Sequence, residues 1–134
     1  MTNRIVCPED GAALAKAFRS HGGVALADEF AQAIAPCQSQ PVSTVASWIV
    51  LRKIISFPAF GSLALPLVQF SKFRPIEGLD RVLLELDALD DLELAGWFLV
   101  PNPWMGDVPP ADRLRDDLSA VLSAARAYRW LMFG

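Results

Sequence analysis

Apolar residues recur at helical spacing along the first third of the chain. This pattern predicts helices over residues 9–20, 25–35 and 42–53. Gly22-Gly23 would end the first helix and Pro36 the second, and Ser43 could cap the third. The inner face of the third helix is expected to carry Val42, Val45 and Ile49. We therefore expect a helical unit over residues 1–53.

The pattern changes over residues 54–78. Two apolar runs flank Gly61 and Ser62, which predicts a β-hairpin with a two-residue turn. Pro58 and Pro66 would restrict its strands to edges or bulges, so the hairpin should be small. The remainder of this region, after Phe70, is expected to be a loop that links the two halves of the chain.

A stripe of apolar residues at positions i, i+3, i+4 and i+7 marks the start of the last region. It consists of Leu79, Val82, Leu83, Leu86 and Leu89. Helices are predicted here over residues 79–89, 90–99, 109–115 and 117–130. The predicted fold class is mainly α: a helix-turn-helix-like N-terminal unit, a small β-hairpin, and a helical C-terminal domain over residues 79–134.

Composition narrows the class of protein. Apolar residues make up 53% of the 134, above the usual share of roughly 45–50%, so the chain can form a core and have apolar surface left for a partner. The apolar stretches fall short of the roughly 20 residues that a membrane span needs, and the N-terminus has no apolar signal core. We expect a cytoplasmic protein with no membrane contact. Cys7 and Cys37 should be ordinary reduced thiols.

Charge is distributed unevenly along the chain. Residues 1–75 hold seven Lys/Arg and four Asp/Glu, whereas residues 76–134 hold five and eleven. The first part could face an anionic partner and the second would be repelled by one. This asymmetry indicates two binding roles on one chain.

Residues for catalysis are sparse. The one histidine, His21, is expected at a helix end, and the carboxylates of Asp87, Asp90, Asp91 and Glu93 should cap a helix junction. The sequence contains neither a phosphate-binding glycine loop nor a metal-ligand pattern. We therefore expect no enzyme activity, no metal and no cofactor.

The second and third predicted helices resemble a helix-turn-helix, in which the second helix enters the major groove of DNA. Polar side chains gather on one face of the third helix, and two cations follow at its end. The candidate DNA-binding residues are Gln40, Ser43, Thr44, Ser47, Arg52 and Lys53. The alternative is a helical pair that only packs.

A second candidate site lies in the last third of the chain. A proline-rich loop over residues 101–106 would present Trp104, and the chain ends on apolar residues where termini are usually polar. Aromatic residues, Met and Arg are enriched at the centres of interfaces. The candidate partner-binding residues are Trp104, Met105, Arg129, Trp130, Leu131, Met132 and Phe133.

The run Trp97-Phe98-Leu99-Val100-Pro101-Asn102-Pro103-Trp104-Met105-Gly106, followed by Pro110, Leu114, Val121 and Gly134, carries a family resemblance. It resembles the toxin-binding domain of Xre/MbcA/ParS-type antitoxins, and Leu65–Phe70 and Gly78-Leu79 resemble the linker and helix start of longer members. Asp107 replaces a second glycine of the motif and Met105 a leucine. The likeness covers residues 65–134, and the N-terminal half does not match the family's usual DNA-binding domain.

The resemblance implies an antitoxin-like regulator that neutralises a cognate RES-type toxin, a class that consumes NAD. It also implies dimerisation or higher assembly and repression of the protein's own operon through operator DNA. Two alternatives stay open. One is a stand-alone DNA-binding repressor with a dimerising C-terminal half, and the other is a non-catalytic interaction or scaffold protein.

Overall fold

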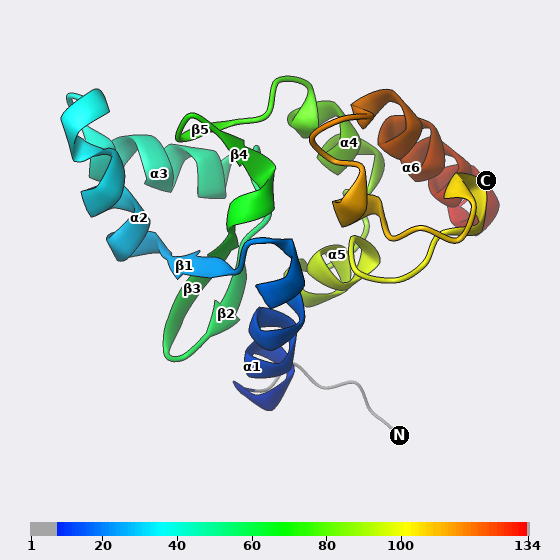
Figure 1. Cartoon of the computed structure of the whole chain (residues 1–134), viewed down its shortest axis with the longest axis horizontal. Coiled ribbons are helices and arrows are strands. Elements are labelled where there is room, and N and C mark those ends of the chain that lie inside the picture. Colours follow the sequence, from blue (N-terminus) through cyan, green and yellow to red (C-terminus); the bar gives the residue numbers. More distant parts are fainter. Residues whose placement is uncertain (1–7, 134) are drawn as a thin grey trace.

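The computed structural model describes residues 8–133, and it is mainly helical with a small antiparallel sheet. The α-helices are α1 (Pro8–Ala17), α2 (Ala27–Ile34), α3 (Pro41–Val50), α4 (Leu79–Glu85), α5 (Asp91–Trp97) and α6 (Leu118–Phe133). Single 3-10 turns are η1 (Phe18–His21), η2 (Ala35–Cys37), η3 (Leu67–Gln69), η4 (Pro103–Met105) and η5 (Pro110–Asp112). Helices α2 and α3 lie at one end of the molecule, and α4 and α6 lie at the other (Figure 1).

Two small antiparallel sheets lie between these ends. The larger has the strand order β1-β3-β2, from β1 (Val24–Leu26), β2 (Phe57–Ala59) and β3 (Ser62–Pro66). The smaller pairs β4 (Phe70–Ser71) with β5 (Arg74–Pro75). Pro58 stands on the edge strand β2, where a missing N–H costs no ladder bond. The predicted hairpin is confirmed as β2–β3, but the expectation that Pro66 would restrict its strand to an edge is wrong, because Pro66 pairs with Val24 at the end of the central strand β3.

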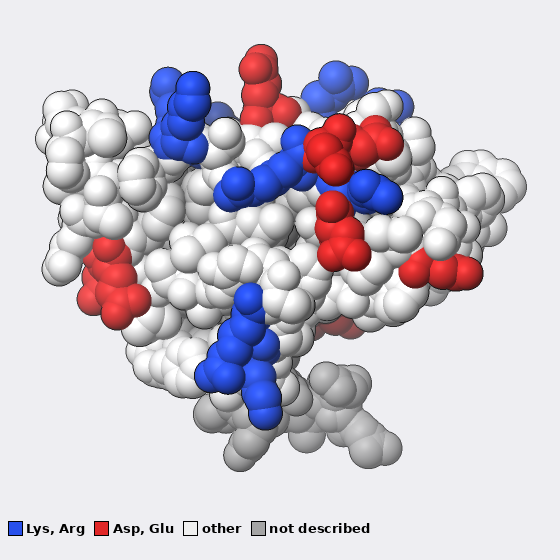
Figure 2. Space-filling view, in the orientation of Figure 1, with Lys and Arg blue, Asp and Glu red and all other residues white. Residues whose placement is uncertain are grey.

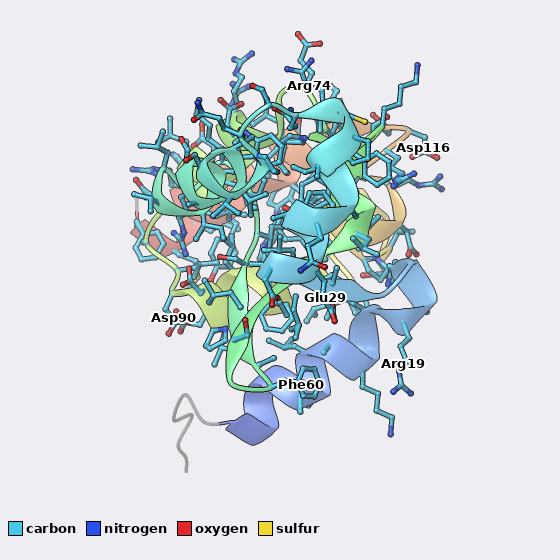
Figure 3. All side chains as sticks on the ribbon, turned by 90° about the vertical axis from the view of Figure 1, so that its left-hand side faces the viewer. Arg19, Glu29, Phe60, Arg74, Asp90 and Asp116 are labelled. Atoms are coloured by element: carbon cyan, nitrogen blue, oxygen red, sulfur yellow. The ribbon has the colours of Figure 1, made fainter. Side chains whose placement is uncertain are left out.

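The hairpin turn differs by one residue from the prediction. Ala59 pairs with Ser62, so Phe60 and Gly61 form the turn, with φ angles of 56° and 72°. A two-residue hairpin of the type that matches strand twist needs positive φ at both positions. Phe60 therefore lies at the hairpin tip with its side chain 63% exposed (Figure 3).

The predicted start of the second helix is also wrong. Residues 24–26 form β1, whose Ala25 pairs with Leu65 of β3, and α2 begins only at Ala27. The Glu29 carboxylate accepts a hydrogen bond from the Leu26 N–H at 3.1 Å, which closes the first turn of α2. A strand partner for β3 has thus overridden local helix preference. The α2–α3 pair exists, while its identity as a DNA-binding helix-turn-helix stays a prediction.

Four further elements differ from expectation. The segment after Phe70, predicted as a loop, contains β5. The predicted helix over 109–115 is reduced to η5, and α4 ends at Glu85 instead of residue 89. At the other end of the chain, α6 continues to Phe133, three residues beyond the predicted end.

Buried side chains form two clusters. The main one draws on α1, β2, β3, α4, α5 and α6 and includes Phe18, Phe57, Leu83, Leu94, Phe98, Leu114 and Val121. The smaller one lies under α2 and α3 and includes Phe30, Ile34, Val45, Leu65 and Phe70. The stripe Leu79, Val82, Leu83 and Leu86 is buried as predicted.

The division of the chain at residues 53 and 78 stays a prediction. Within residues 8–133 the structure has no helix long and apolar enough to cross a membrane.

Candidate functional site

The last turn of α6 is exposed on all sides. The inner face of the earlier turns of α6 is buried and consists of Val121, Ala124 and Ala125. The four residues that follow Arg129 are exposed. Trp130 is 71% exposed, and Leu131, Met132 and Phe133 are each 58–59% exposed. Successive helical residues point about 100° apart, so these four side chains cover the whole circumference. A helix that is apolar all round is normally buried, and no other part of residues 8–133 covers this one.

Arg129 anchors this turn, although its side chain is 46% exposed. Its guanidinium donates to the Leu84 carbonyl at 3.1 Å and to Oδ1 of Asp87 at 3.0 Å. These acceptors lie at the C-terminal end of α4, where cations are favoured. Arg129 binds these groups of its own chain, and its predicted role in binding a partner stays a prediction. Arg126, also on α6, forms an ion pair with Glu85 of α4 at 3.5 Å.

Leu84 belongs to this surface and sequence reasoning missed it. Its side chain is 67% exposed at the end of α4 to which Arg129 binds. A signal was present, because Leu84 falls outside the buried stripe and puts an apolar residue on the polar face of α4. We define the C-terminal apolar surface as Leu84, Trp104, Trp130, Leu131, Met132 and Phe133.

Trp104 is presented by a loop that Asn102 organises. The Asn102 side chain, 7% exposed, accepts a hydrogen bond from the Trp104 N–H at 2.9 Å, and its carbonyl accepts from Met105 and Asp107. Trp104 is 61% exposed on η4, and η4 contacts α6. The two lie side by side at the end of the molecule where the chain terminates (Figure 1). Met105, also predicted to bind a partner, packs against the main core cluster.

The candidate DNA-binding residues are only partly brought together. Gln40, Ser43 and Ser47 are exposed along one face of α3, and Thr44 is half-buried beside them. Lys53 is exposed beyond the other end of the helix.

Arg52 is turned away from that face. Its backbone is left-handed, with φ 54°. Its guanidinium donates to the Leu89 carbonyl at 2.6 Å, the Asp87 carbonyl at 3.3 Å and Oδ1 of Asp91 at 3.2 Å. Arg52 therefore ties the end of α3 to the α4–α5 connection, and the prediction that it faces DNA with the α3 residues is not met.

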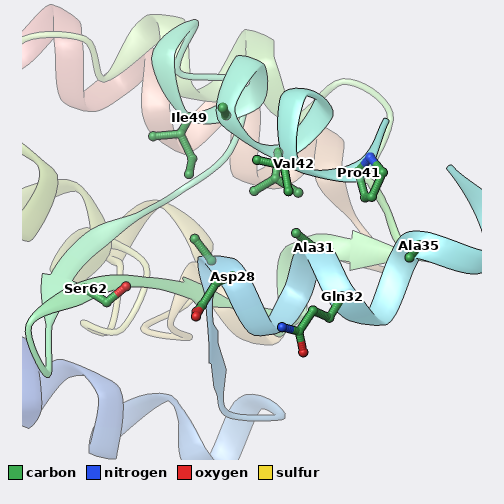
Figure 4. Close-up of a pocket in the computed structure, with 11 residues that line it drawn as sticks. Asp28, Ala31, Gln32, Ala35, Pro41, Val42, Ile49 and Ser62 are labelled. Carbon is green, nitrogen blue, oxygen red and sulfur yellow. The ribbon is translucent and has the colours of Figure 1, made fainter. Parts of the chain in front are cut away.

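A groove separates α2 from α3 (Figure 4). Its volume is about 470 Å³, and it is lined mostly by small apolar side chains, including Ala31, Val42, Val45 and Ile49. Val42 was expected in the core but is 72% exposed on the groove wall, whereas Val45 is 3% exposed. Val45 belongs to the smaller buried cluster, whereas Val42 does not.

The groups considered for catalysis have structural partners. His21 Nε2 lies 2.5 Å from Oδ1 of Asp112 and joins η1 to η5. Asp90 and Glu93 form a reciprocal cap at the start of α5, with N–H to carboxylate distances of 2.8 and 2.9 Å. Among the described residues no group of three His, Cys, Asp or Glu could hold a metal ion. Cys37 is exposed, and Cys7 lies outside the described residues.

Charged side chains cluster over the region of α4, and the end at which α6 terminates is largely uncharged (Figure 2).

Comparison of the chain with protein-family models, curated proteins and solved structures finds no match. The C-terminal apolar surface is therefore the strongest candidate site, and it is identified by its geometry alone.

Proposed function

We propose that this protein is a non-catalytic binding protein that recognises a second protein through its C-terminal apolar surface. The observation that carries the proposal is the last turn of α6, which is apolar on every side and 58–71% exposed. The family resemblance adds a specific form of this function: an antitoxin-like regulator that covers a RES-type toxin and represses its own operon.

The surface is large enough for binding only if its apolar side chains are buried together. Full burial of a large apolar side chain contributes about 1.5–3 kcal/mol. Association costs about 4–15 kcal/mol in lost freedom, so the tail alone gives a weak contact. Leu84 and Trp104 extend it to six large side chains, with Arg129 holding the tail in place before binding. A helix end of this kind suits a hydrophobic groove on the partner.

The test is co-expression with the protein encoded next to this one, because toxin and antitoxin are normally encoded together. We expect a stable complex, weakened at least tenfold in affinity by Trp130→Ser combined with Phe133→Ser. Phe60→Ser is the matched control for the Phe133→Ser part of this change, since Phe60 is similarly exposed but lies at the β2–β3 tip. A mixture that stays separate, or equal effects of both sets of changes, would argue against the proposal.

DNA binding is the second candidate function, favoured by the exposed face of Gln40, Ser43 and Ser47 at the start of α3. It predicts affinity for a duplex fragment of the protein's own promoter that falls steeply with salt. Ser43→Ala with Gln40→Ala should weaken it, whereas Gln32→Ala on exposed α2 should not. Absence of binding at low salt would exclude this function.

A further inference from the structure

The hairpin formed by β4 and β5 has an unusual tip. Phe70 pairs with Pro75 and Ser71 with Arg74, so Lys72 and Phe73 occupy the two central turn positions. Their φ angles are 52° and 63°. Such turns normally use Gly, Asn or Asp, because other side chains are strained at positive φ. Two bulky residues in this conformation cost local stability, and the turn places the Phe73 side chain at its tip.

The base of this hairpin is held firmly. Arg115 donates to the carbonyls of Leu67, Val68 and Phe70, the last at 2.6 Å. The Phe70 ring stacks on Phe30 with centroids 4.2 Å apart. The Phe73 ring lies 6.3 Å from the same Phe30 ring and remains 47% exposed. The tip is thus a preorganised platform with one aromatic side chain half in solvent.

A polar pocket lies between this tip and the connection that follows α2. It is lined by Lys72, Phe73, Arg74, Cys37 and Gln38, and its volume is about 370 Å³. That volume falls within the range of small-ligand sites. Arg74 lies at the outer edge of the molecule (Figure 3).

The electrostatic surroundings of the pocket favour an anion. Between Glu29 and Glu77 the sequence contains no Asp or Glu. Neither Lys72 nor Arg74 forms an ion pair with any described side chain of residues 11–133. Lys and Arg side chains stand out over the β5 region in Figure 2. Two cations on one pocket, without carboxylates on its walls, attract a negatively charged ligand.

We propose that this pocket binds a nucleotide unit, either free or in a single-stranded nucleic acid. Arg74 and Lys72 bind the phosphate, since a guanidinium fork matches phosphate oxygens and an ammonium adds charge. Phe73 stacks on the base, as exposed aromatic residues do in proteins that bind single strands. The site is separate from the C-terminal apolar surface and from the polar face of α3, and it uses none of their residues.

The test measures fluorescence anisotropy of labelled oligo(dT) at low salt, with unlabelled AMP as competitor. Lys72→Ala with Arg74→Ala should weaken oligonucleotide binding at least tenfold. The matched control is Lys16→Ala with Arg19→Ala, which removes the same charge from exposed positions on α1 and η1 and should have little effect. If AMP competes, the pocket is a site for free nucleotides. If the oligonucleotide binds and AMP does not compete, the pocket is a site for single-stranded nucleic acid.

Phe73→Asn is the deciding variant, because Asn tolerates positive φ and keeps the turn while removing the ring. It should retain the melting temperature and lose binding at least fivefold. The proposal is overturned if Phe73→Asn binds as well as the original chain. It is also overturned if both charge-removing pairs weaken binding equally, if a poly-glutamate peptide competes as well as the oligonucleotide, or if neither oligo(dT) nor AMP binds.

Discussion

The side-chain amide of Gln69 pairs with both backbone polar groups of Ile55. The Ile55 N–H donates to Oε1 at 2.5 Å, and Nε2 donates to the Ile55 carbonyl at 2.8 Å. Both residues are 0% exposed. Gln69 therefore takes the place of a neighbouring strand for a buried segment that enters β2. A buried backbone group without such a partner would cost stability.

Replacing Gln69 with Leu should destabilise the fold. The change leaves the N–H and C=O of Ile55 unsatisfied, at a cost of about 1–3 kcal/mol for each group. Chemical denaturation should show a clear drop in the midpoint. The control is Gln32→Leu on the exposed side of α2, which should leave the midpoint nearly unchanged. Equal midpoints for both variants would show that the Gln69–Ile55 pair contributes little.

Two helical glycines should respond to alanine in opposite directions. At Gly11 of α1 an added Cβ would lie 2.0 Å from the Pro58 carbonyl oxygen of β2, so the helix must move. We expect Gly11→Ala to destabilise the protein by about 1–3 kcal/mol. At Gly96 of α5 an added Cβ meets no atom within 4 Å, and Gly96→Ala should stabilise by about 0.5–1 kcal/mol.

Thermal melting of the two variants checks this pair. The expected order of melting temperature is Gly96→Ala above the original chain and Gly11→Ala below it. The reverse order, or no difference, would mean that α1 does not rest closely on β2.

Alanine substitution of Arg52 and of Lys53 should change the free energy of unfolding by very different amounts, although the two cations are adjacent. Arg52→Ala removes three hydrogen bonds that join α3 to the α4–α5 connection, and we expect a loss of roughly 1–3 kcal/mol. Lys53→Ala changes an exposed side chain and should stay within about 0.5 kcal/mol. Urea denaturation distinguishes the two. Similar small effects would indicate that the Arg52 contacts are unimportant for folding.

Periodic patterns predicted the elements whose packing is local. The stripe from Leu79 to Leu86 marks α4 because one buried face is enough to define an amphipathic helix. The β2–β3 hairpin was also recoverable, since a turn residue stood between two apolar runs. The register of the hairpin could not be predicted, because Phe60 occupies a turn position with positive φ that glycine usually occupies.

Non-local contacts account for the errors. Residues 24–26 look helical by themselves, and only the presence of β3 makes them a strand. Arg52 and Arg129 read as free surface cations, yet each binds carbonyl groups more than 30 positions away in the chain. Val42 has core character but lies on a groove wall. Leu84 could have been found from its position opposite the buried stripe, whereas the Lys72–Phe73 platform depends on a turn that no local pattern indicated.

Oxidative footprinting tests most directly whether the C-terminal apolar surface is bare in the free chain and covered in a complex. Hydroxyl radicals label side chains in proportion to their exposure, and the chain contains internal references. Trp97 and Met105 are partly buried against the core, so they serve as references for Trp130 and Met132.

In the dilute isolated protein we expect Trp130 and Met132 to be labelled much faster than Trp97 and Met105. In the complex with the protein encoded next to it, labelling of Trp130 and Met132 should fall to the level of those references. Slow labelling of Trp130 and Met132 in the isolated chain, or rapid labelling that persists in the complex, would contradict the account.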